Sequence, residues 1–107
     1  MRSESIPVII RVEGDSRRSK QTAHRDDVVA FFPTEPGTYD PRTMSCYSHA
    51  GQHSTCEVGY IGSETRKASR SEVAMMLKEL RAVGYRNLKV VARASSQHAR
   101  ARRAALR

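Results

Sequence analysis

Two cysteines and two histidines lie close together near the middle of the chain, and side chains of these types can bind a metal. Their spacing is Cys-x2-His-x3-His-x2-Cys, formed by Cys46, His49, His53 and Cys56. Structural zinc takes four thiolate or imidazole ligands in a tetrahedral arrangement. A small zinc-binding protein is therefore one interpretation of this segment, provided that the four side chains can converge.

The element that carries these residues is predicted to be a β-hairpin over residues 44–61, with Gly51 in its turn. In this register the two cysteines lie opposite each other, and so do the two histidines. Side chains alternate between the two faces along a strand, so the thiols and the imidazoles point to opposite faces. We therefore expect no metal site and no cofactor, and keep zinc binding as an alternative.

The two faces of this hairpin are predicted to have different roles. Cys46 and Cys56 share the expected core face, where free cysteine behaves as a small hydrophobic residue. The other face is expected to be an exposed, polar and aromatic surface formed by Tyr47, His49, His53 and Glu57. A protein-binding module, or an inhibitor of a host protein, is therefore an alternative function.

Catalysis by this segment would need a nucleophile and a base in contact. Cys46 and His49 are the candidate pair, but they point to opposite faces of the predicted hairpin. The chain has no phosphate-binding loop and no paired-carboxylate motif, so we predict that it is not an enzyme. A disulfide between Cys46 and Cys56 is geometrically conceivable, although a cytosolic setting would keep both thiols reduced.

Charge is distributed unevenly along the chain. The net charge is +8, yet the basic and acidic residues of positions 1–79 balance each other. Every charged residue after Glu79 is basic, so the whole net positive charge comes from the last 28 residues. A neutral domain with a basic end is typical of a protein that contacts polyanions.

The basic end is therefore the candidate contact for nucleic acid, or for an acidic protein partner. We expect salt-sensitive phosphate contacts from basic residues of the tail and of the polar loop 14–27, namely Arg93, Arg100, Arg102, Arg103, Arg107, Arg17, Arg18 and Lys20. The tail, residues 94–107, is expected to be flexible, because only Leu106 offers an apolar anchor. The alternative is that GC-rich coding, rather than function, produced this Ala- and Arg-rich end.

One helix is clearly predicted, between Ser69 and Gly84. Ser69 and Glu72 form a capping box, and Gly84 suits the left-handed position that ends a helix. An apolar stripe runs along the predicted helix through Val73, Met76, Leu77, Leu80 and Val83. Such a stripe indicates that the helix packs on an apolar surface.

Further strands are predicted over residues 6–12, 28–32 and 88–93, from alternating or continuous β-branched and apolar residues. With the hairpin and the helix, the order is ββββαβ. We therefore expect a single α+β domain over residues 1–93. It would hold a largely antiparallel sheet of four or five strands with one helix on one face, followed by the basic tail.

Residues 28–91 resemble a family of small, uncharacterised proteins of bacteria, phages and mobile elements. The resemblance rests on Val-Ala-Phe-Phe-Pro at 29–33, Cys-Tyr-Ser-His-Ala-Gly-Gln-His at 46–53, Glu-Leu-Arg-Ala-Val-Gly-Tyr at 79–85 and Leu-Lys-Val-Val at 88–91. It implies a bacterial, cytoplasmic and phage-linked or mobile-element origin. It carries over no known activity.

Composition excludes several other classes of protein. Hydrophobic residues make up 38% of the chain and charged residues 28%, which is polar for a folded domain but too apolar for a wholly disordered chain. No apolar run approaches the 18 or so residues of a membrane span, and no secretory signal is recognisable. Two cysteines are too few for a disulfide scaffold. We expect a cytoplasmic protein without a membrane partner.

Overall fold

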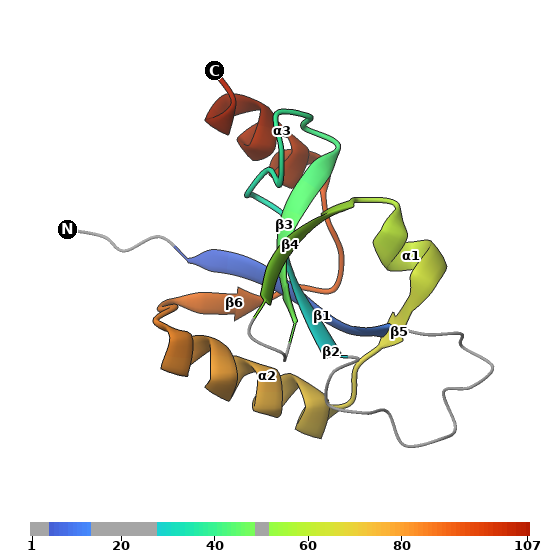
Figure 1. The fold of residues 1–107 in the computed structure, drawn as a ribbon, viewed down its shortest axis with the longest axis vertical. Coiled ribbons are helices and arrows are strands. Elements are labelled where there is room, and N and C mark those ends of the chain that lie inside the picture. The colour runs from blue at the N-terminus through green and yellow to red at the C-terminus, as the bar shows by residue number, and fades with distance from the viewer. Residues whose placement is uncertain (1–4, 14–27, 49–51) are drawn as a thin grey trace.

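The computed structural model describes residues 5–13, 28–48 and 52–107, which form an α+β fold (Figure 1). The elements in chain order are β1 (Ile6–Glu13), β2 (Val28–Phe32), β3 (Thr43–Ser48), β4 (Gln52–Glu57), α1 (Tyr60–Glu64), β5 (Thr65–Lys67), α2 (Arg70–Val83), β6 (Leu88–Val90) and α3 (Ser96–Ala105). The predicted α+β class with a largely antiparallel sheet is confirmed, but the described residues form six strands and three helices rather than four or five strands and one helix. No helix in this described part of the chain has the length and the apolar character needed to cross a membrane.

The strands form one sheet in the order β4-β3-β2-β1-β5, with β6 also paired to β1. All neighbours along the path are antiparallel, whereas β6 runs parallel to β1. The start of β1 pairs with β6 and its end pairs with β5, so these two short strands share one side of β1. The predicted sheet lacked β5, and the predicted element order lacked two of the three helices seen in the described residues.

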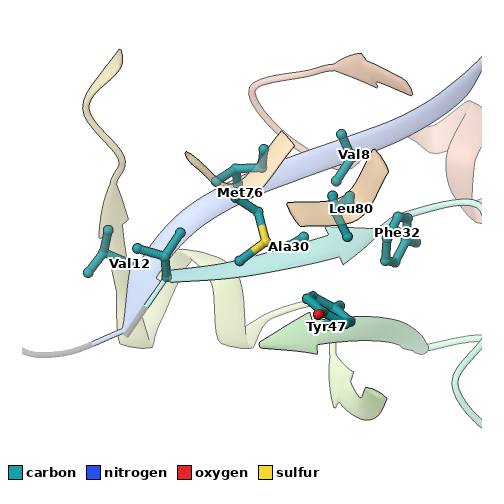
Figure 2. Close-up of a cluster of buried hydrophobic side chains, with 9 residues drawn as sticks. Val8, Val12, Ala30, Phe32, Tyr47, Met76 and Leu80 are labelled. Atoms are coloured by element: carbon teal, nitrogen blue, oxygen red, sulfur yellow. The ribbon is translucent and has the colours of Figure 1, made fainter. Parts of the chain in front are cut away.

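One face of the sheet is covered by α2 (Figure 2). Met76 and Leu80 are fully buried against the sheet, where they meet Val8, Ala30 and Phe32. The predicted capping box is present, because the Ser69 side chain accepts a hydrogen bond from the Glu72 amide and the Glu72 carboxylate accepts one from the Ser69 amide. Burial of two large apolar side chains and a satisfied first turn together explain why this segment is helical.

The apolar stripe predicted for α2 extends about one helical turn beyond the residues that pack in the core. Val83 is 50% exposed, so it does not belong to the core. Gly84 ends α2 with a φ of 125°, and its amide donates to the carbonyls of Leu80 and Arg81. The chain then turns back, and Tyr85 stacks on Phe32 with the ring centroids 4.9 Å apart. Tyr85 therefore takes the place at the end of the core that the helical spacing assigned to Val83.

The second face of the sheet is covered by the segment around α1. Ile61 of α1 is buried with Phe31, Met44 and Cys46, which point to this face. Residues 58–61 were predicted to continue the second hairpin strand. The strand ends instead at Glu57, and the chain bends so that Ile61 covers apolar side chains that would otherwise face water.

Within the basic tail, which was predicted to be flexible over residues 94–107, residues 96–105 form α3 and lie against the domain. Ser95 and His98 form a capping box at the start of α3. Arg102 is only 4% exposed, and its guanidinium donates to the carbonyl oxygens of Pro41 and Pro33 at 2.7 and 2.5 Å. Figure 1 shows α3 beside the loop that joins β2 to β3. The missing apolar anchor is replaced by a buried arginine.

Candidate functional site

The candidate nucleic-acid contact is the outer surface of α3. Arg100, Arg103 and Arg107 are exposed, and Arg93 is exposed in the segment that leads into the helix. None of the four forms an ion pair with a carboxylate in the described part of the chain. Ten helical residues span about 15 Å; Arg100 and Arg103 lie on this helix, and Arg107 follows its end.

Arg102 does not belong to this surface, although it was predicted as a nucleic-acid contact. Its guanidinium lies inside the protein, whereas those of Arg100 and Arg103 on the same helix are exposed. Burial lowers the pKa of Arg102, and the nearby charge of Arg103 lowers it further. An arginine stays protonated in proteins even so, and Arg102 acts as the charged anchor of the helix.

The remaining predicted contacts of this kind, Arg17, Arg18 and Lys20, lie outside the described residues. The same holds for His49, which was predicted both as a protein contact and as an alternative zinc ligand.

The hairpin register differs from the predicted one by two residues. Cys46 lies opposite Ser54, and Cys56 lies opposite Met44. Because the shift is an even number of residues, each side chain keeps its predicted face. Cys46 and Cys56 therefore lie on one face, and His53 lies on the other face opposite Tyr47.

Tyr47 is buried, which corrects its assignment to an exposed binding surface. It is only 3% exposed and belongs to the core under α2. Its ring meets the ring of His53 edge-on with centroids 5.0 Å apart, and His53 Nε2 lies 3.1 Å from the Tyr85 hydroxyl. Of the predicted protein-binding residues that the structure describes, only His53 and Glu57 are exposed. Tyr47 cannot contribute an aromatic anchor to a partner.

The two thiols are free and face the same side of the hairpin. Cys46 is buried, and its sulfur lies 3.0 Å from the Ser54 hydroxyl. The pKa of Cys46 is lowered, chiefly by the neighbouring Cys56 side chain and also by the Ser54 hydroxyl, while burial acts in the opposite direction. The pKa of Cys56 is raised by the neighbouring Cys46 side chain and by burial.

The described members of the alternative zinc set do not converge, because His53 lies across the sheet from both thiols. Across residues 5–13, 28–48 and 52–107, no three His, Cys, Asp or Glu side chains gather as ligands for one ion.

Sequence reasoning missed three neighbours of the thiol pair. Ser54 was recognisable in principle, since it alternates with Cys56 along one strand and must share its face. Glu13 and Tyr60 could not be recognised as neighbours from the sequence, because they belong to β1 and α1 rather than to the hairpin. Tyr60 donates a hydrogen bond to the Glu13 carboxylate, which raises the pKa of Tyr60 to about 12.

Comparison of the chain with models of protein families, with curated proteins and with solved structures gave no match.

Proposed function

We propose that this protein is a non-enzymatic, basic accessory protein that contacts nucleic acid in the cytoplasm through the exposed arginines of α3. The observation that carries this proposal is that the arginines of the C-terminal segment have two different roles. Arg102 holds the helix on the domain, and Arg100, Arg103 and Arg107 remain exposed. The bacterial, phage or mobile-element origin implied by the Cys-Tyr-x-His-x-Gly-Gln-His resemblance is part of the same proposal.

Phosphate is the chemical group that suits this surface. The guanidinium groups of Arg100 and Arg103 on α3, and that of Arg107 just beyond its end, meet a polymer that carries one negative charge per about 1.7 Å of duplex axis. A helix that is already formed does not have to be ordered on binding, so less conformational entropy is lost than with a flexible tail. Contacts of this kind position a protein on nucleic acid without reading its sequence.

Tyr39 adds a feature that favours single strands. It is 95% exposed and lies in the loop between β2 and β3, the loop whose Pro33 and Pro41 carbonyls hold Arg102. An exposed aromatic ring beside a basic surface can stack on an unpaired base, which contributes about 1–3 kcal/mol per base. Bases of an intact duplex are not available for such stacking.

The test is a titration of labelled single-stranded and duplex oligonucleotides at several salt concentrations. A variant with Arg100→Ser, Arg103→Ser and Arg107→Ser should bind more weakly. Its salt dependence on single strands should flatten by about 2 units of log K per log salt, because about 0.7 is lost per phosphate contact.

The matched control removes three exposed charges elsewhere, with Lys78→Ser, Arg81→Ser and Lys89→Ser. This control should keep the salt slope of the unmodified protein. Tyr39→Ala should weaken binding to single strands and leave duplex binding unchanged. Equal affinities and slopes for the α3 variant and the unmodified protein would refute the proposal, as would binding only to an acidic protein.

A further inference from the structure

A hollow bounded by described residues lies on the face of the sheet that carries both thiols. Its volume is about 620 Å³. The side chains of Cys46, Ser54 and Cys56 line it on the hairpin side, and those of Glu13 and Tyr60 line it from β1 and α1. Nucleic-acid contact through α3 makes no use of this cleft.

The two sulfurs lie on adjacent antiparallel strands at diagonal positions. Cys46 pairs with Ser54, and Cys56 stands two residues further along β4 on the same face. The Ser54 hydroxyl lies 3.0 Å from the sulfur of Cys46, and Cys56 is the diagonal neighbour of Cys46. Cys46 is therefore the better nucleophile of the pair, since the Ser54 hydroxyl can stabilise its thiolate.

We propose that Cys46 and Cys56 form a dithiol redox site in which Cys46 reacts with a small uncharged hydroperoxide and Cys56 completes a disulfide. In the first step the Cys46 thiolate attacks the outer oxygen, the O–O bond breaks and the alkoxide or hydroxide leaves with a proton from the medium. Cys46 is then a sulfenic acid. In the second step the Cys56 sulfur attacks Cys46, the S–O bond breaks and water leaves. Two thiols and one hydroperoxide thus give one disulfide, one alcohol or water, and one further water.

The charge of the cleft selects among oxidants. Glu13, Glu57 and Glu64 line it, and no described lining residue is basic. Anionic oxidants are therefore repelled, and uncharged ones are favoured. The cleft also has a firm apolar floor in Val29 and Phe31, which suits a small molecule without charge.

Closure of the disulfide requires the two strands to move closer at this point. A sulfur–sulfur bond is about 2.05 Å long, and diagonal side chains on neighbouring strands start further apart. Among the described strands, β4 is at the end of the sheet and pairs only with β3. A shift of β4 therefore disturbs a single ladder of hydrogen bonds, so β4 can move relative to β3 when the disulfide forms.

The first experiment treats the reduced full-length protein with hydrogen peroxide and measures free thiols and mass. One equivalent should remove both thiols and lower the mass by two hydrogens, without forming a dimer. Cys56→Ala should stop at a Cys46 sulfenic acid that dimedone traps, and Cys46→Ala should react at the rate of an ordinary thiol. Cys46→Ser serves if the alanine variant unfolds, as judged by circular dichroism.

The second experiment compares modification of Cys46 by uncharged iodoacetamide and by anionic iodoacetate. The ratio of the two rates should exceed the ratio for free cysteine at least several-fold. It should fall toward that value in high salt and in a Glu13→Gln, Glu57→Gln, Glu64→Gln variant.

An intermolecular disulfide would overturn the proposal. So would oxidation that leaves Cys56 reduced in the unmodified protein, or a Cys46→Ala variant that reacts as fast as the unmodified protein.

Discussion

Arg102 illustrates how the same residue type takes opposite roles within one short helix. Its neighbours Arg100 and Arg103 are exposed, whereas Arg102 donates to two backbone carbonyls inside the protein. From the sequence alone these arginines are equivalent positive charges. Nothing local distinguishes them, because the carbonyl groups that accept from Arg102 belong to Pro33 and Pro41, 69 and 61 residues earlier.

Arg102→Ala should lower the free energy of unfolding by about 1–3 kcal/mol, because carbonyl groups that it satisfies lose their donor. Arg102→Lys should also be destabilising, since one ammonium cannot reproduce the fixed fork of a guanidinium. Urea unfolding followed by circular dichroism measures both. Arg103→Ala is the control, and its free energy should stay within about 0.5 kcal/mol of the unmodified protein. Equal stability of the Arg102 and Arg103 variants would contradict the anchoring role.

At the level of elements, the sequence predicts the strands and helices that local signals determine and misses those that depend on contacts distant along the chain. The strand Val28–Phe32 and the capped helix α2 were predicted with nearly their observed bounds, because apolar runs and capping boxes are local signals. The hairpin register was wrong by two residues, and α1 and β5 were missed. Both errors concern segments whose conformation depends on covering or pairing with other parts of the sheet.

Leu80→Ala should lower the free energy of unfolding by about 2–5 kcal/mol, because the Leu80 side chain is fully buried between α2 and the sheet and its loss leaves a cavity. Val83→Ala, three residues later on the same helix, should change it by no more than about 0.5 kcal/mol, since Val83 is half exposed. Thermal or urea unfolding of the pair measures the difference. Similar losses for both variants would mean that the helix packs through the longer stripe suggested by its spacing.

The start of α3 should be sensitive to pH through His98. Burial, together with the charge of Arg102, lowers the pKa of His98 below its ordinary value of 6.5. The neutral ring accepts a hydrogen bond from the Ser95 amide through Nδ1. Below pH 6.5 the unfolded chain binds a proton that the folded chain resists, so stability is present above that pH and is lost as the pH falls.

The measurement is the unfolding midpoint between pH 7.5 and 5, for the unmodified protein and for His98→Gln. Glutamine keeps the capping geometry but does not titrate, so the variant should lose less stability on acidification. An identical decrease of the unfolding midpoint in both proteins would show that other titrating groups cause the loss of stability at low pH.

On the scale of the whole molecule, β1 is the element on which the rest is assembled. It pairs with β2 on one side and with β5 and β6 on the other. Val8, Ile9, Ile10 and Val12 are all buried, because α2 covers one face and the segment around α1 covers the other. The sequence suggested a sheet with one covered face, and the continuous apolar run of β2 was the sign that both faces are covered.

Native-state hydrogen exchange should follow this arrangement. Amides of β1 and β2 should exchange slowest, since they open only when the whole sheet opens. Amides of β4, which has one strand neighbour in the described part of the chain, and of the three-residue β6 should exchange much faster. Exchange as slow in β6 as in β1 would indicate that the C-terminal part unfolds together with the sheet rather than before it.

The place of β5 and β6 beside β1 has a consequence during synthesis. The first four strands, up to Glu57, leave the ribosome with one side of β1 unpaired and with the apolar surface that α2 will cover still exposed to water. Both are completed only by residues 65–90. At about 5–20 residues per second, residues 58–90 take about 2–7 s to be added. For those seconds the nascent chain carries a half-covered sheet with a bare edge, which is the form most open to chaperones and to pairing with neighbouring chains.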